Sequence, residues 1–375
     1  MHAAVCLAVV LILAFTPASH TTHTRDHPEL GQLRLNQIQV IGTHNSYKQA
    51  VQPELFEIML THDPRSESLD YAHPPIPEQL TLGVRNLELD LYNDPEGGHY
   101  RRPLGHIVLK GIGVEPLPFG RGDEMDKPGF KVMHECNFDY RSHEMTFAGT
   151  LERMREWSDA NPAHLPIFVT MNLKGGGSPA PGGIDAIEWD AASMRELDRT
   201  LIEALGRDNL ITPDDVRGGH STLADALEHE GWPTIDEVRG RILFVVDHGG
   251  SIRDMYVDGN ERMAGRPMFT SGPEGSAYGV FHIINDPKRD HLRIARLVES
   301  GHIVRTRADA GTREMRTNDR SRFEAAMRSG AQVITTDYPA PDARHNAAYQ
   351  VVFEDGTYAR PNPISAGASA APRNP

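Results

Sequence analysis

Eight short runs of apolar and β-branched residues recur along this chain, and longer stretches with helical spacing separate them. In residues 145–160, for example, Phe147, Leu151 and Met154 recur every three or four positions, which predicts an amphipathic helix. Because strands that alternate with helices pair in parallel through crossovers, the pattern predicts an α/β fold, a closed (β/α)8 barrel of the TIM type. An open, doubly wound sheet is the alternative, but no G-x-G-x-x-G motif follows the first strand. The predicted strands are QIQVIGTH (37–44), NLELDLY (86–92), FKVMHE (130–135), PIFVTMNLK (166–174), RILFVVD (241–247), GVFHII (279–284), HIVRTRA (302–308) and QVITTDYP (332–339).

The two ends of the chain do not follow this pattern. The apolar run Ala3–Phe15 is short for a membrane span, and small residues follow it, so we predict a signal peptide over residues 1–18 and a secreted or periplasmic protein. A membrane anchor or a buried helix is the alternative, because no Lys or Arg precedes the run. We expect a lead-in over residues 19–34, one barrel domain over 35–345, and a largely disordered tail over 346–375 that is rich in Ala and Pro.

The charge of the chain excludes one class of partner. With a net charge of −14, the chain is too acidic to bind nucleic acid through its phosphates, and no protein partner is evident. Residues 95–130 are rich in Gly and Pro, and we place them as a long excursion between the second and third predicted strands. Within it, the apolar stretch 107–119 either inserts into a lipid bilayer or packs on the barrel, and the sequence leaves both open.

Polar residues gather where the predicted strands end. In this fold the catalytic residues lie at the carboxyl ends of the strands. Glu88 and Asp90 share one face of the second strand, so their charges repel each other unless a cation lies between them. The other polar residues at strand ends are His44 and Asn45 after the first strand, His134 on the third, and Asn172 and Lys174 on the fourth.

These residue types suit a divalent metal and proton transfer. Carboxylate and amide oxygens bind Ca²⁺ or, less well here, Mg²⁺, in preference to zinc. Two histidines beside such an ion can donate and accept protons, which is what phosphoryl transfer requires. In the alternative interpretation, Glu88 and Asp90 pair with arginines inside the barrel, for which Arg305 and Arg307 are at hand.

Several of these stretches resemble the catalytic barrel of phosphoinositide-specific phospholipases C, and more closely the secreted bacterial Ca²⁺-dependent C1-like members of that superfamily of phosphodiesterases. The resemblance runs from Leu35 to Pro339, and its landmarks occur in the expected order. The landmarks are LNQIQVIGTHNSYK (35–48), GVRNLELDLY (83–92), FKVMHE (130–135), DYRS (139–142), LPIFVTMNLK (165–174), GWPTIDEVRGRILFVVD (231–247), HIVRTRADAGT (302–312) and GAQVITTDYP (330–339).

The resemblance implies a role for each site residue. His44 and His134 are the implied catalytic histidines, and Glu88 is a candidate base. Where relatives have a carboxylate on the fourth strand this chain has Asn172, and one negative charge fewer predicts weaker Ca²⁺ binding. The implied metal ligands are Asn45, Glu88, Asp90 and Asn172, and the implied substrate contacts are Lys174, Arg305, Arg307 and Tyr338.

The reaction that the resemblance implies is attack by the inositol 2-hydroxyl on its own phosphodiester, which releases diacylglycerol and a cyclic inositol phosphate. The implied partner is an inositol phospholipid at a membrane surface. Two alternatives stay open. A glycerophosphodiester phosphodiesterase shares the barrel and a similar TDYP ending but takes soluble diesters, and an inositol-lipid-binding protein without catalysis would be compatible with Asn172.

Overall fold

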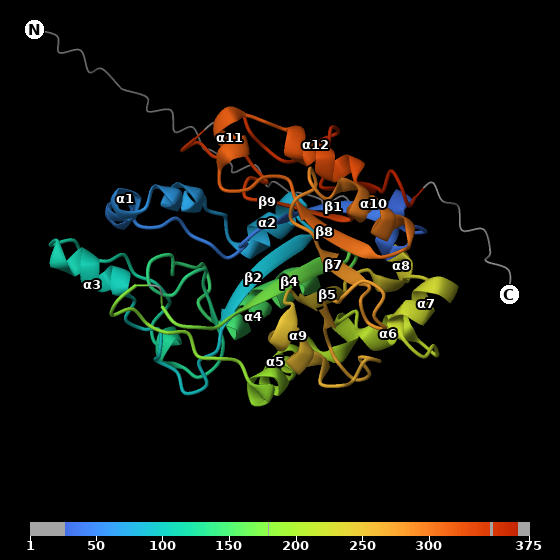
Figure 1. The fold of residues 1–375 in the computed structure, drawn as a ribbon, viewed down its shortest axis with the longest axis horizontal. Coiled ribbons are helices and arrows are strands. Elements are labelled where there is room, and N and C mark those ends of the chain that lie inside the picture. Colours follow the sequence, from blue (N-terminus) through green and yellow to red (C-terminus); the bar gives the residue numbers. More distant parts are fainter. Residues whose placement is uncertain (1–26, 179, 346–347, 367–375) are drawn as a thin grey trace, which may run out of the picture.

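A computed structural model of the chain describes residues 27–178, 180–345 and 348–366. Eight parallel strands form one curved sheet, in the spatial order β6-β5-β4-β2-β1-β9-β8-β7 (Figure 1). The two outer strands, β6 and β7, approach each other through the parallel bridge between Ser271 and Phe281, so the barrel is nearly closed. The predicted TIM-type barrel is therefore confirmed. Its strands are β1 (Ile38–Thr43), β2 (Asn86–Tyr92), β4 (Ile167–Lys174), β5 (Ile242–Val246), β6 (Phe269–Thr270), β7 (Phe281–Ile283), β8 (Ile303–Arg307) and β9 (Val333–Thr336).

One of the eight predicted strands is not part of the barrel. Within FKVMHE, only β3 (Lys131–Val132) is extended, and it pairs antiparallel with the end of β2. The barrel strand missing from the prediction is β6, Phe269–Thr270. Two residues are too few to show an alternating pattern, so only the pairing of β6 with β5 reveals this strand.

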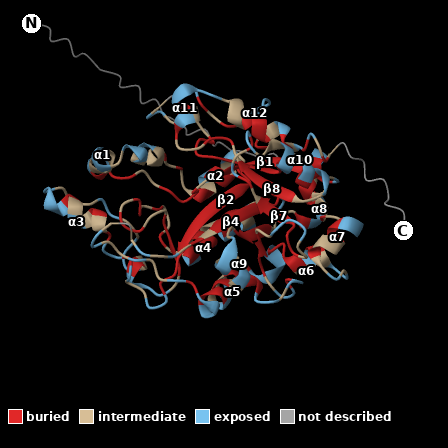
Figure 2. Cartoon of the chain, viewed as in Figure 1, coloured by how far each residue is buried: buried red, intermediate tan, exposed pale blue. Residues whose placement is uncertain are grey.

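Helices cover the outside of the barrel, and the strands between them are buried (Figure 2). The helix predicted from periodicity in residues 145–160 corresponds to α4 and is confirmed. The helices are α1 (Pro53–His62), α2 (Ile76–Leu82), α3 (Leu104–Gly111), α4 (Phe147–Ala160), α5 (Ala191–Leu205), α6 (Pro213–Arg217), α7 (Leu223–His229), α8 (Ile235–Val238), α9 (Gly250–Val257), α10 (His291–Glu299), α11 (Arg313–Thr317) and α12 (Ser321–Arg328).

The connections after β1 and β2 build a lobe beside the barrel, on the left of Figure 1, with its own hydrophobic core. Leu55 of α1 and Leu109 of α3 are buried in this core together with Met133 and Tyr140. The long excursion between β2 and β4 is thus a folded part of the molecule. Because both connections leave the carboxyl ends of barrel strands, the lobe stands at the same end as the predicted site.

The tail is partly ordered, which corrects the prediction of disorder from residue 346 onward. Residues Ala359–Pro361 form β10, which pairs antiparallel with β1 over the register Ile38↔Pro361 to Val40↔Ala359. Tyr349, Val351 and Phe353 are buried in the main core. The predicted signal peptide lies outside the described residues. In the part of the chain that is described, no helix combines the length and apolar character needed to cross a membrane.

Candidate active site

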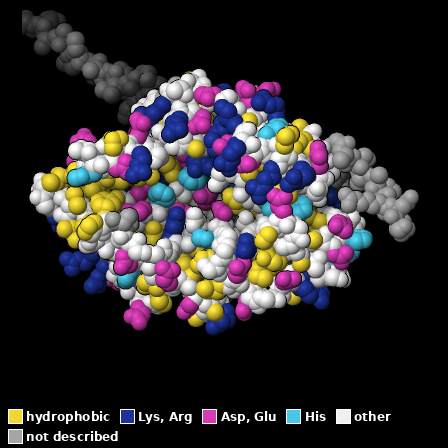
Figure 3. All heavy atoms as spheres, viewed as in Figure 1, with side chains coloured by type: hydrophobic (Ala, Val, Ile, Leu, Met, Phe, Trp, Pro, Cys, Tyr) yellow, Lys and Arg dark blue, Asp and Glu magenta, His cyan; other side chains and the backbone are white. Residues whose placement is uncertain are grey.

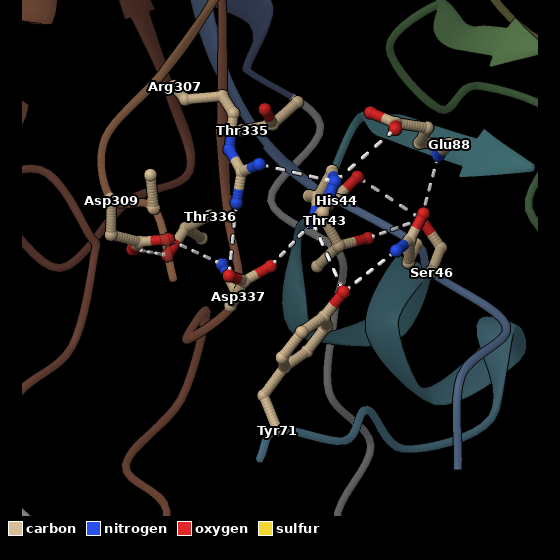
Figure 4. A network of polar contacts seen from close by, with 12 residues as sticks. Thr43, His44, Ser46, Tyr71, Glu88, Arg307, Asp309, Thr335, Thr336 and Asp337 are labelled. Atoms are coloured by element: carbon tan, nitrogen blue, oxygen red, sulfur yellow. Dashed lines mark hydrogen bonds and ion pairs between the residues drawn. The ribbon is translucent and has the colours of Figure 1, made fainter. Parts of the chain in front are cut away.

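His44 directly follows β1, and residues from the ends of β8 and β9 orient its ring (Figure 4). Its Nδ1 lies 2.8 Å from Oδ1 of Asp337, and its Nε2 lies 3.3 Å from Nη1 of Arg307. An arginine nitrogen can only donate, so Nε2 accepts and Nδ1 carries the proton that is donated to Asp337. Burial lowers the pKa of His44 well below its usual value, and the Arg307 charge acts in the same direction. The ring is therefore a neutral imidazole in one fixed tautomer.

His134 is held in the same manner by a different carboxylate. Its Nδ1 lies 2.8 Å from Oδ2 of Asp139, whose other oxygen lies 2.7 Å from Nζ of the buried Lys48. Burial alone would raise the pKa of Asp139, but the Lys48 and His134 charges outweigh it and lower this pKa below its usual value. Asp139 is thus an ionised acceptor that fixes the His134 ring. The His134 side chain itself keeps 25% of its surface exposed. The backbone N–H of Met133, the residue before His134, lies 3.3 Å from the backbone oxygen of Asp90, which places His134 beside the end of β2.

The two carboxylates of β2 each have a basic partner in this structure. Glu88 accepts a hydrogen bond from Arg305, and its Oε1 lies 3.6 Å from Nε2 of His44. Oδ2 of Asp90 lies 2.8 Å from Nζ of Lys174. The interpretation in which the barrel pairs these carboxylates with basic residues is thus correct for Glu88 with Arg305, whereas Asp90 pairs with the lysine.

A third carboxylate, Asp247, belongs to the same cluster as Glu88 and Asp90, and it was not among the residues predicted from the sequence. It directly follows β5, the neighbour of β4, and its backbone N–H donates to Met171 O at 2.8 Å. Burial raises the pKa of Asp247 to about 7; the charges of Glu88 and Asp90 raise it as well, against the opposing effect of Arg305. Glu88, Asp90 and Asp247 thus disfavour one another's ionisation, and additional positive charge bound beside them would stabilise their charged forms.

The oxygen donors of this cluster fit a calcium ion. Asp90 Oδ1 is buried without a hydrogen-bond partner among the described residues, which is costly for a carboxylate unless a cation occupies the site. Asn45 has the left-handed φ of +50°, and its side-chain nitrogen donates to Tyr71 Oη at 2.7 Å, so its amide orientation is fixed. Asn172 pairs in register with Asp90 across β2 and β4. The donor set is oxygen-rich, as Ca²⁺ prefers.

The structure brings together nearly all of the predicted site residues. Arg307 contacts both His44 and Asp337, with its Nη2 3.1 Å from Asp337 Oδ2. Tyr338 is the exception, because its side chain is buried edge-to-face against Tyr349 with the ring centroids 5.7 Å apart. The residues that the structure gathers at this end of the barrel are His44, Asn45, Glu88, Asp90, His134, Asn172, Lys174, Arg305 and Arg307, and we call this group, together with Asp247, the mouth.

Sequence reasoning missed Asp247, the carboxylates that orient the histidines and the tyrosine that orients Asn45. Asp337 follows β9 and Asp247 follows β5, so the rule of polar residues at strand ends would have found both. Asp139 and Tyr71 lie in irregular segments; Asp139 belongs to the DYRS landmark, which assigned it no role, and no pattern pointed to Tyr71. Asp337 is itself positioned by Asp309, whose Oδ1 accepts the Asp337 backbone N–H at 2.9 Å.

Comparison with solved structures shows which known folds this one resembles. The fold is similar to that of the calcium-dependent phosphoinositol-specific phospholipase C from the Gram-negative bacterium Pseudomonas sp. in its apo form, with 17% identity over 89% of this chain and 97% of that chain and a TM-score of 0.56. The myo-inositol complex of the Pseudomonas protein gives the same values. A Ca²⁺-dependent phosphatidylinositol-specific phospholipase C from Streptomyces antibioticus has 18% identity, covers 81% of this chain and 94% of that chain, and has a TM-score of 0.49.

Sequence comparison supplies the family. No curated protein sequence matches the chain. The sequence model of one family, described as phosphoinositide phospholipase C, Ca²⁺-dependent, matches residues 33–363, which is most of the chain. This protein therefore belongs to the family of Ca²⁺-dependent phosphoinositide phospholipases C.

Proposed function

We propose that the mouth cleaves phosphatidylinositol by transferring its phosphorus from the glycerol oxygen to the 2-hydroxyl of the inositol ring. The observation that carries the proposal is that two histidines of the mouth, His44 and His134, are each held at Nδ1 by a buried carboxylate, with His44 also 3.6 Å from Glu88. In His134 this arrangement leaves Nε2 for proton exchange with a substrate, and in His44 it leaves an unprotonated Nε2 whose contact with Arg307 is 3.3 Å long. A proton acceptor on one side of a phosphodiester and a proton donor on the other suit the transfer of phosphorus between two oxygens of the same substrate.

In the proposed step, Nε2 of neutral His44 takes the proton of the 2-hydroxyl while that oxygen bonds to phosphorus. The bond between phosphorus and the glycerol oxygen breaks, and protonated His134 gives its Nε2 proton to this leaving oxygen. The products are diacylglycerol and a 1,2-cyclic inositol phosphate. Because Glu88 lies in a buried pair with Arg305, whereas Nε2 of His44 has only the longer 3.3 Å contact with Arg307, we assign the base to His44 rather than to Glu88.

Calcium and the basic side chains support this step in different ways. Asn45, Glu88, Asp90, Asn172 and Asp247 are the residues that would hold Ca²⁺, which supplies positive charge for the phosphate and acidifies a bound hydroxyl. Lys174 and Arg307 stand at the same end of the barrel, where they would contact phosphate oxygens.

We further propose that the protein is secreted and that it works on a lipid surface. Three of the six large apolar side chains that are strongly exposed in the described residues lie within eleven residues of the sequence: Ile107 at 55%, Ile112 at 55% and Leu117 at 41%. We call residues 104–119 the rim. Figure 3 shows this apolar surface on the left, over α1 and α3, beside the hollow at the centre of the molecule. An apolar rim beside a polar mouth suits a substrate whose headgroup enters the barrel while its acyl chains stay in the bilayer.

The charge of the rim region supports a lipid surface over a protein partner. Residues 101–119 contain three basic residues (Arg101, Arg102 and Lys110) and one acidic residue (Glu115), which gives +2 on a chain with a net charge of −14. The anionic headgroups of inositol lipids attract such a patch.

The test is phosphorus NMR of the mature chain with phosphatidylinositol micelles, first with Ca²⁺ and then with excess chelator. We expect a cyclic phosphodiester signal that stops growing after chelation. Glycerophosphoinositol serves as the parallel substrate. Turnover of this soluble diester without turnover of the lipid would replace the proposal with a glycerophosphodiester phosphodiesterase, and binding of both without product would reduce the protein to a lipid-binding one.

A further inference from the structure

A second cluster of possible metal ligands lies away from the mouth, on and beside α7. Figure 1 places α7 on the opposite side of the barrel from α1 and α3, and the chain leads from it through α8 to the beginning of β5. His220, Asp225 and His229 each offer one ligand atom here, and these three atoms lie within 4.8 Å of one another. We propose that this cluster binds one zinc ion or a similar transition-metal ion, separate from the calcium site.

The separations between the side chains match what such an ion requires. His220 Nδ1 lies 3.7 Å from Asp225 Oδ2, and the His229 ring lies at the same place, with its Nδ1 3.3 Å from Asp225 Oδ1. Ligands about 2.0–2.1 Å from a tetrahedral zinc ion stand about 3.3 Å apart, close to the spacing of His220 and Asp225. Asp225 and His229 lie side by side because they are one helical turn apart on α7, while His220 comes from the segment just before it.

Each histidine also has a second partner of the kind that orients a metal-binding imidazole. His229 Nδ1 lies 2.8 Å from the backbone oxygen of Asp225, so it carries the proton and leaves the Nε2 lone pair free. His220 Nε2 lies 3.3 Å from Oε1 of Glu230, which leaves Nδ1 to face the cluster. A carbonyl or carboxylate behind the imidazole fixes the tautomer and increases its basicity toward a metal.

The ligand types distinguish this cluster from the mouth. Two imidazoles with one carboxylate favour zinc over calcium, whereas the mouth presents mainly oxygen atoms. The side chains keep 21%, 36% and 62% of their surface exposed for His220, Asp225 and His229, so an ion can reach them from solvent. Bound there, zinc joins α7 to the segment that precedes it, and we infer a stabilising role that does not depend on the proposed reaction.

The experiment is equilibrium dialysis of the full mature chain against micromolar Zn²⁺ with Ca²⁺ in large excess, followed by metal counting by mass spectrometry. His220→Ala and His229→Ala each remove one ligand, from a partly exposed and an exposed position, and His62→Ala at the exposed end of α1 is the matched control. We expect each cluster variant to retain one zinc per chain fewer than the unmodified chain and the control. Comparing variants separates this site from any zinc held in the mouth.

A second measurement, of thermal stability, does not rely on counting metal ions. Zn²⁺ should raise the thermal midpoint of the unmodified chain and of His62→Ala, and this gain should be lost in both cluster variants, since an ion that binds only the folded state stabilises it. Equal zinc content and equal thermal gain in all four proteins would overturn the proposal, as would a chain that retains no zinc at all. Far-UV circular dichroism checks that the variants are folded.

Discussion

The mouth and the rim distribute their side chains in opposite ways. In the mouth, charged groups such as Arg305 and Asp90 are almost completely buried, at 2% and 1% exposure. In the rim, isoleucine and leucine side chains stand in solvent. Stability alone would favour the reverse in both regions, because buried charges and exposed apolar groups each cost free energy. The contrast is what the proposed function requires, in which the mouth takes a charged headgroup and the rim meets lipid tails.

The mouth can be tested most strongly by removing its base. His44→Ala should lower kcat by about 1,000-fold, because general acid–base groups contribute on the order of 100- to 10,000-fold. Initial rates from the phosphorus NMR assay measure this effect, with His62→Ala as a control that leaves the mouth intact. A folded His44→Ala variant with ordinary turnover would contradict the assignment.

The buried pairs of the mouth should also support the fold. Asp139→Asn leaves Lys48 charged and buried with no ionised partner, which should cost about 3 kcal/mol of unfolding free energy. Urea denaturation measures this loss at neutral pH.

The pH dependence of this difference has a defined sign. Because its neighbours hold the pKa of Asp139 below the usual value, the carboxylate stabilises the fold above the unfolded pKa of about 3.9. That contribution is lost as the pH falls through the lower folded pKa. The gap between the two proteins should therefore close in strong acid, and a gap that widened there would exclude this explanation.

The rim should affect activity only on substrate that is held in a lipid surface. Changing Ile107, Ile112 and Leu117 together to serine should lower activity on phosphatidylinositol vesicles by about tenfold or more, since each side chain loses apolar area that the bilayer would bury. Turnover of a monomeric, short-chain substrate should not change. The matched control is Leu292→Ser, which alters an 83% exposed leucine on α10. Equal losses on both substrates would show that the rim acts on the fold instead.

The smallest expected effect concerns the amide on β4. Asn172→Asp would place a carboxylate opposite Asp90 and should tighten Ca²⁺ binding a few-fold, because affinity rises with the number of charged ligands. Isothermal titration with Ca²⁺ measures this change. Weaker binding in this variant would mean that Asp247, Glu88 and Asp90 already provide all the negative charge that the ion tolerates.

The sequence predicted parts of the site for different reasons. Glu88 and Asp90 were found because β2 alternates strictly, so that one face carries both carboxylates. His134 was placed in the site as the end of a barrel strand, but it follows the short antiparallel β3 instead. The resemblance of its surrounding motif to a known family, and not the strand count, identified this residue.

Other features had no signal in the local periodicity of the sequence. The tail contains β10, yet Ala359–Pro361 has no strand pattern, and it becomes a strand because the edge of β1 offers it backbone partners. Asp139 lies in an irregular segment, and its role depends on the packing that brings Lys48 and His134 to it. Contacts of this kind follow from side-chain reach in three dimensions, which local periodicity does not record.

The sequence by itself determined the parallel barrel and the end of it that carries the chemistry, because apolar periodicity and polar strand ends are local properties of the chain. Only the tertiary structure decided which cation meets which carboxylate. Arg305 pairs with Glu88, which is 217 residues away in the sequence, and Lys174 pairs with Asp90. The physical reason is that a buried charge is stabilised by whichever opposite charge the closed barrel brings within reach, and closure joins residues from distant strands.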